Sequence, residues 1–129
     1  MNALELIKNC PDAIVGHGAS EDEINKAENE LGMQFASDYR AYLQKYGAVM
    51  LNGHELSGIS PAKHLSVISL THDWQKKYDQ SVKLYIIENL GIDDIVILQD
   101  SNGNIYQSQN GKIHKIFNSL TAYIAEICV

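Results

Sequence analysis

Apolar residues recur at helical spacing in the first part of the chain, and polar residues mark where the helix begins and ends. The segment 19–32, ASEDEINKAENELG, has Ser20 as an N-cap, Glu23 three residues later as in a capping box, and Gly32 as a stop. Three apolar residues share one face of this predicted helix: Ile24, Ala27 and Leu31. The acids of the segment point elsewhere, which is typical of a solvated face.

Three further segments show the same period. A helix is predicted over residues 37–47, SDYRAYLQKYG, with Gly47 as its stop. Another is predicted over residues 66–78, where β-branched side chains weaken the helix propensity. The last is predicted over residues 117–128, FNSLTAYIAEIC, and begins with an Asn-Ser cap. Their apolar stripes are Tyr39, Tyr42, Leu43 and Tyr46; Val67, Leu70 and Trp74; and Leu120, Tyr123, Ile124 and Ile127. Such stripes predict core packing rather than a cofactor site.

The segments between and after these helices predict strands. Asn52-Gly53 is a hairpin turn between the apolar stretches AVML and HELSGI, because Asn-Gly tolerates the positive φ of tight turns. Later, the pattern changes to period two or to short apolar runs, separated by DSNGN and QNG turns, in VKLYIIEN, DIVILQ, IYQSQ and KIHKIF. Consecutive strands joined by tight turns predict an antiparallel meander.

Together these elements predict a single α+β domain over residues 1–129, in which helices pack an antiparallel meander mainly on one face and leave the other face more open. A chain of this length is typical of one domain. The residues predicted for the core are Ile24, Leu31, Tyr39, Leu43, Ile95, Ile97, Tyr123 and Ile127.

Composition and motifs indicate a cytosolic protein. The longest uncharged apolar run, Ile95 to Leu98, is far shorter than the ~20 residues that span a bilayer. Residues 1–11 carry Glu5 and Lys8, where a signal peptide would be apolar. Cys10 and Cys128 show no CxxC spacing, so we expect two small apolar residues in a reducing compartment rather than a disulfide framework.

The charge pattern is the feature that most restricts the partners. Sixteen acids against ten bases give a net charge of −6, which argues against nucleic-acid or anionic-membrane binding and leaves a basic protein as a partner. No Lys or Arg occurs in residues 84–111, although four acids lie around the central predicted strands: Glu88, Asp93, Asp94 and Asp100. This uncompensated charge would attract a cationic protein; the alternative is that it serves only solubility.

Motif searches favour a non-catalytic protein without metal or cofactor. The five His residues lack HExxH, HxxxH or Cys/His spacing, and phosphate-binding glycine motifs and GxSxG are absent. DSNGN has its glycine at the fourth place instead of the sixth, so it is a turn and not a calcium loop. Asp93, Asp94 and Asp100 remain as a possible paired-carboxylate site, although acids at strand ends usually solvate turns.

Three stretches resemble the SUKH superfamily of bacterial immunity proteins: ASEDEINKAENELGMQFASDYRAYLQKYGA, IENLGIDDIVILQDSNGNIYQ and IFNSLTAYIAEI. The resemblance covers nearly the whole chain and rests on the Leu31-Gly32 helix end, residues 38–43, residues 91–100 and residues 117–120. One departure is Phe35-Ala36, where the family often has Leu-Pro, which alters a helix entry and not the fold.

The resemblance implies a non-catalytic domain that protects its producer by binding a cognate toxin, commonly a nuclease. Related fungal domains act as regulatory scaffolds, so a scaffold is one alternative to the immunity protein. A small enzyme that uses the Asp93, Asp94 and Asp100 carboxylates is the other. We expect a monomer or weak dimer whose partner is a basic toxin, since a nuclease needs basic surface for its substrate. The surface that we predict for this partner comprises Glu55, Glu88, Asp93, Asp94, Asp100 and Tyr106.

Overall fold

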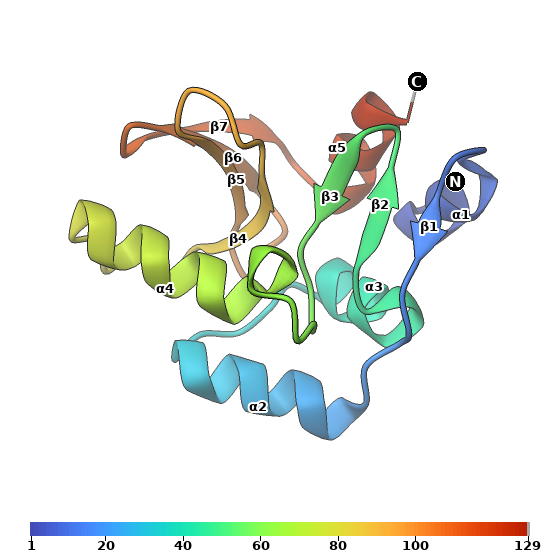
Figure 1. Cartoon of the computed structure of the whole chain (residues 1–129), viewed down its shortest axis with the longest axis horizontal. Helices are drawn as coiled ribbons and strands as arrows, with labels where there is room; N and C mark the ends of the chain where they lie inside the picture. The colour runs from blue at the N-terminus through green and yellow to red at the C-terminus, as the bar shows by residue number, and fades with distance from the viewer. Residues whose placement is uncertain (129) are drawn as a thin grey trace.

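The computed structural model describes residues 1–128 and has five helices, a short 3-10 turn and a seven-stranded sheet in this part of the chain (Figure 1). The elements are, in order, α1 (Ala3–Asn9), β1 (Ile14–Val15), α2 (Glu21–Leu31), α3 (Ser37–Tyr46), β2 (Val49–Leu51), β3 (His54–Leu56), η1 (Lys63–Leu65), α4 (Val67–Tyr78), β4 (Tyr85–Asn89), β5 (Ile95–Gln99), β6 (Ile105–Gln109), β7 (Lys112–Phe117) and α5 (Leu120–Ile127).

The sheet is a sequential antiparallel meander, which confirms the predicted fold class. Its strand order is β1-β2-β3-β4-β5-β6-β7, and every neighbouring pair is antiparallel. Asn52-Gly53 and Asn110-Gly111 adopt the positive φ values that were expected of the hairpin turns. Strand β4 contains a bulge between Ile86 and Glu88, the position at which its register against β5 shifts.

The helices begin and end where their caps predicted. Ser20 and Glu23 form both hydrogen bonds of a capping box at the start of α2, and Gly32 ends that helix in the left-handed conformation. Ser66 caps α4 and Ser119 caps α5 through their side chains. Helix α1 and strand β1 were not predicted, although Asn2 and Glu5 form a second capping box that the sequence displays.

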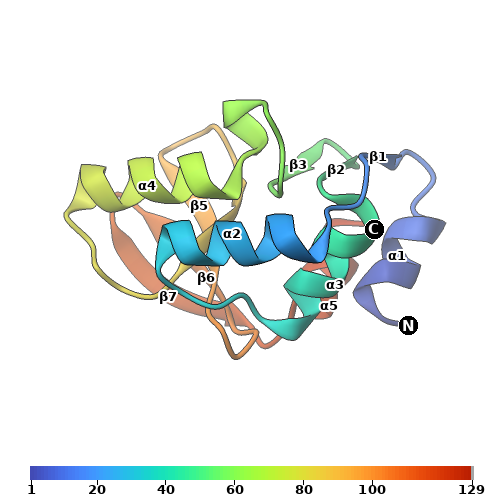
Figure 2. The same ribbon diagram turned by 90° about the horizontal axis from the view of Figure 1, so that it is seen from below.

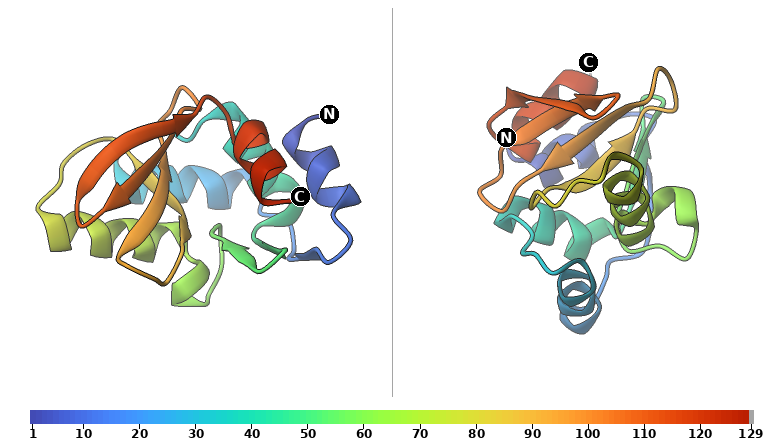
Figure 3. Two further views of the ribbon diagram at one scale, coloured as in Figure 1. Left: turned by 90° about the horizontal axis from the view of Figure 1, so that it is seen from above. Right: turned by 90° about the vertical axis from the view of Figure 1, so that its left-hand side faces the viewer.

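Both faces of the sheet carry helices, with most of them on one face. The main core joins residues of α1, α2, α3 and α5 to Tyr85, Ile87, Ile97 and Ile105 of the sheet. Helix α4 packs against the opposite face through Trp74, where it meets Ile86, Val96 and Leu98. Figure 2 shows α2 and α4 running side by side, and Figure 3 shows α5 beside α1.

The main core is aromatic and its polar atoms are satisfied. Seven of the eight predicted core residues are buried, and the eighth, Ile95, is half-buried. Tyr39 and Tyr42 stack with ring centroids 5.4 Å apart, and each hydroxyl donates to the carbonyl oxygen of Ser57, at 3.2 and 2.9 Å. Burial raises the pKa of both tyrosines, so they remain neutral donors.

Asp38 connects three elements at the edge of this core. Its carboxylate accepts a hydrogen bond from Gln99 Nε2 of β5 at 3.0 Å and another from the backbone N–H of Leu120, the first residue of α5, at 2.9 Å. A carboxylate at a helix N-terminus also interacts favourably with the helix dipole. Asp38 therefore fixes α5 and β5 relative to α3.

Candidate partner-binding surface

Asp100 in the β5–β6 turn and Tyr106 on β6 lie together. Asp100 Oδ1 accepts hydrogen bonds from the backbone N–H groups of Asn102 and Asn104 at 2.9 and 3.0 Å, and Oδ2 accepts one from the Tyr106 hydroxyl at 2.8 Å. Burial alone would raise the pKa of Asp100, but these hydrogen bonds and those from the Asn104 side chain stabilise the charged form, so the pKa is lowered. The carboxylate is committed to holding the turn, with part of its surface still accessible.

Glu88 is the predicted site residue that the structure places differently. Its side chain is 3% exposed, His54 Nδ1 lies 2.8 Å from Oε2, and Tyr123 Oη donates to Oε1. Burial raises the pKa of Tyr123, and the negative charge of Glu88 raises it further, so the hydroxyl remains a donor. The expectation that Glu88 contributes to an exposed acidic surface is therefore wrong, because its carboxylate is satisfied inside the protein.

Asp93 and Asp94 lie in the β4–β5 loop, at the opposite end of β5 from Asp100. Asp94 is 34% exposed by side chain and pairs with Lys77 Nζ of α4 at 3.0 Å, whereas Asp93 is exposed. Strand β5 has five residues between these positions, which corresponds to about 17 Å at ~3.4 Å per residue. Residues 84–111 contain no base, so the charge count of this segment gave no sign that Asp94 would be paired. Its partner, Lys77, belongs to the earlier helix α4.

Glu55 lies on β3, the strand that pairs with β4 in the sheet. It pairs across the sheet with Met50, its side chain is 42% exposed, and the nearest base is His64 with Nε2 at 3.7 Å. The structure thus brings Asp100 and Tyr106 together, and leaves Glu55 and the Asp93-Asp94 pair as separate exposed sites. The six predicted residues do not form one continuous cluster.

A groove between α4 and the β4–β5 hairpin was not predicted. Its volume is about 180 Å³, and it is lined by Leu70, Asp73, Trp74, Lys77, Tyr78, Ile86, Asn89, Asp94 and Val96. The floor is apolar and aromatic, and carboxylates stand at the rim. Sequence reasoning placed Trp74 on the packed face of its helix but gave no indication of which strands that face would meet.

A second, larger groove lies beside the edge strand β1. Its volume is about 340 Å³, and the residues around it include Ile14, Val15 and Met50, which are 65%, 48% and 40% exposed. None of its lining residues is acidic. This groove offers apolar contact without the charge that was expected to attract a basic protein.

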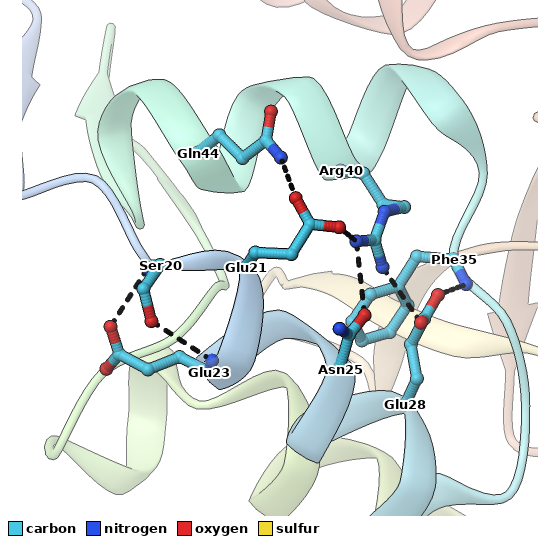
Figure 4. Close-up of polar contacts among 8 residues, drawn as sticks. All are labelled: Ser20, Glu21, Glu23, Asn25, Glu28, Phe35, Arg40 and Gln44. Carbon is cyan, nitrogen blue, oxygen red and sulfur yellow. Dashed lines mark hydrogen bonds and ion pairs between the residues drawn. The ribbon is translucent and has the colours of Figure 1, made fainter.

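The acids of α2 form a second acidic region, and the structure shows which of them are already paired. Arg40 of α3 binds Glu21 Oε1 and Glu28 Oε1, each at 2.8 Å, while Glu23 serves the capping box (Figure 4). Asp22 and Glu30 are exposed on the same helix. The Asp-Tyr-Arg stretch therefore has structural roles at each residue: Asp38 holds α5, Tyr39 fills the core, and Arg40 joins α3 to α2.

Metal ligands, membrane-spanning helices and reactive thiols are the remaining features that bear on function. Within residues 1–128, no group of three His, Cys, Asp or Glu side chains is placed to hold a metal ion, and no helix of this part is long and apolar enough to cross a membrane. Cys128 has its pKa raised to about 12 by burial and by the neighbouring Cys10, which keeps the thiol protonated at neutral pH.

The sequence of this chain matches a known protein family. The model of the family SUKH_5, described as SMI1-KNR4 cell-wall, matches residues 2–129, which is nearly the whole chain.

Proposed function

Because this chain belongs to the SUKH_5 family, we propose that it is an immunity protein that binds and neutralises a cognate bacterial toxin in the cytosol of its producer. The family match carries this proposal, since SUKH domains are generally binding domains. The proposed mode of action is steric: the protein occupies the toxin surface that would otherwise meet its substrate. No bond is made or broken by this protein.

The charge distribution supports a basic partner. The net charge is −6, and three exposed sites on different elements carry carboxylates: Glu55 on β3, Asp93 and Asp94 in the β4–β5 loop, and Asp22 and Glu30 on α2. Complementary charge raises the association rate and disfavours wrong partners more than it raises affinity. A nuclease toxin presents basic surface to phosphate, so an acidic inhibitor fits that surface.

The direct test is binding and protection with the toxin encoded by the adjacent reading frame. We expect an inactive form of that toxin to co-purify with this protein, and coexpression of this protein to restore growth of cells that carry the active toxin. Absence of both effects with every neighbouring toxin candidate would contradict the proposed function. Size-exclusion chromatography of the free protein should show a monomer or a weak dimer.

A second candidate is a regulatory interaction scaffold, which the reference to the cell wall in the description of the family favours. On this alternative, deletion of the gene would change the sensitivity of the producer to cell-wall stress in the absence of any toxin. An immunity protein without this role leaves that sensitivity unchanged, so the two candidates are distinguished by one deletion strain tested with and without toxin.

A further inference from the structure

The β4–β5 loop differs in sequence from two other hairpin turns of this chain. The turns of the β2–β3 and β6–β7 hairpins use Asn52-Gly53 and Asn110-Gly111, with φ of 48° and 80° and of 52° and 82°. The β4–β5 loop has the same left-handed pair of conformations, with φ of 50° and 56°, but places Asp93-Asp94 there. The backbone N–H of Ile95 donates to the carbonyl of Ile92 at 3.0 Å across this pair, as in a two-residue turn.

Two adjacent carboxylates are an unfavourable choice for such a turn. Positive φ at both central residues favours Asn or Asp at the first place and Gly at the second, so Asp94 stands where glycine is preferred. The two charges also repel each other. A sequence that departs from local preference in a turn often does so where the residues serve another purpose.

The groove beside this turn supplies that purpose. Asp73 and Asp94 line this groove together with Lys77, and Asp93 precedes Asp94 in the exposed turn beside it. Trp74 and Tyr78 contribute an aromatic floor on the α4 side. The adjoining loop residue Ile92 is 63% exposed and adds an apolar contact at the same place.

The groove already binds one cation, the ammonium group of Lys77. Its Nζ lies 3.0 Å from Asp94 Oδ1 and 5.4 Å from the centre of the Tyr78 ring, so a cation sits between a carboxylate and an aromatic face. The Lys77 side chain is 61% exposed, and an exposed pair of this kind contributes little and exchanges readily with solvent. A partner's cation could therefore displace it without disturbing the fold.

We propose that this groove between α4 and the β4–β5 loop receives a lysine or arginine side chain of the partner protein, with Asp73 and Asp94 of its lining binding the charge and the exposed Ile92 and Asp93 of the adjoining loop contacting the partner beside it. The inference rests on the proposed toxin-binding function and assigns a surface to it. The volume of about 180 Å³, some six waters at ~30 Å³ each, fits one long side chain, and the apolar floor suits its alkyl stem. The groove beside β1 lacks acids and does not offer this combination.

The turn suggests a variant that separates binding from folding. Asp93→Asn with Asp94→Gly restores the Asn-Gly pair of the other two turns, so the melting temperature should equal or exceed that of the wild type. Affinity for the toxin encoded by the adjacent reading frame, supplied as an inactive variant, should fall at least about tenfold, because close charge pairs at an interface act on dissociation as well as association.

The control removes the same charge elsewhere. Asp22→Asn with Glu30→Gln eliminates two exposed carboxylates of α2, and this double variant should bind within about twofold of the wild type if the groove is the site. Lys77→Gln removes the competing cation and should raise affinity by a fewfold, whereas Lys26→Gln, the same change on the exposed side of α2, should raise it less.

Calorimetric titration of all five proteins gives distinct outcomes. Weaker binding of the Asn-Gly variant, with the α2 variant unaffected, supports the proposal. Equal affinities of the wild type and the Asn-Gly variant overturn the assignment of the groove while leaving the toxin-binding function intact. Equal losses in both double variants overturn it as well, because they indicate a general effect of net charge. No binding by the wild type overturns the function and, with it, this inference.

Discussion

Leu43 provides the most direct test of how the helices pack on the sheet. It is 0% exposed in the main core, on the face of α3 that also carries Tyr39 and Tyr42. Leu43→Ala removes three carbon atoms, which is about 2.4 kcal/mol at ~0.8 kcal/mol per buried CH₂. The cavity that remains adds to this loss, so the expected total is about 2.4 to 5 kcal/mol.

Urea unfolding measures this difference, with an unchanged m-value as the sign that the folded and unfolded states are otherwise the same. For a chain of 129 residues, an unfolding entropy of ~2.1 cal/mol/K per residue makes each kcal/mol worth about 4 °C in melting temperature, so we expect a decrease of about 9 to 18 °C. Ile92→Ala, at a side chain that is 63% exposed, is the control and should change the free energy of unfolding by less than about 0.5 kcal/mol. A loss below about 0.5 kcal/mol for Leu43→Ala would refute the packing described for α3.

Three other residues give independent tests. Glu88→Ala leaves His54 and the buried hydroxyl of Tyr123 without their acceptor, and should lower the free energy of unfolding by about 2 to 4 kcal/mol in urea; an effect near zero would contradict its buried role. Folding lowers the pKa of Asp100, so the contribution of this carboxylate to stability is present above the unfolded pKa of about 3.9 and disappears as pH falls through the folded value. Asp100→Asn should therefore be less stable than the wild type at pH 7 and approach it in acid. A stability difference that stays constant with pH would contradict this linkage. Burial and the neighbouring Cys10 raise the pKa of Cys128, so this thiol should react with a thiol reagent at pH 8 more slowly in the native protein than after unfolding; equal rates in the two states would contradict the raised pKa.

The helices and the meander could be predicted because their signals are local. Ser20 with Glu23, Gly32 and Gly47 mark helix ends by chemistry that involves only neighbouring residues, and the Asn-Gly pairs mark hairpin turns in the same way. Helix α1 carries an equally local signal in Asn2 and Glu5, and its seven residues are too few for the apolar period to be recognised.

The placement of the acids could not be predicted, because it depends on pairing between distant segments. Strict alternation from Tyr85 puts Glu88 on the face of Ile86, opposite the main core. The bulge between Ile86 and Glu88 turns the carboxylate to the core side instead, where α5 supplies Tyr123. Bulges of this kind follow from the packing of the whole sheet and leave no distinct mark in a single sequence.

The partner of Asp94 was likewise hidden by distance along the chain. Lys77 lies 17 positions earlier, on a helix whose packing against β4 and β5 had no sequence signal. The Asp93-Asp94 turn was visible in the sequence as a pair of acids, yet its left-handed conformation, and hence the contrast with Asn52-Gly53, emerges only from the backbone. Local chemistry therefore predicted the elements, and tertiary contacts decided which acids remain available for a partner.

The proposed toxin-binding function can be tested by titrating the inactive toxin from the adjacent reading frame into this protein. The titration is done at about 0.05 M and at about 0.5 M salt. An acidic immunity protein should form a one-to-one complex whose affinity decreases at the higher salt concentration, since charge complementarity between exposed groups is screened. Absence of binding at both salt concentrations, for each toxin encoded beside the gene, would contradict the proposed toxin-binding function.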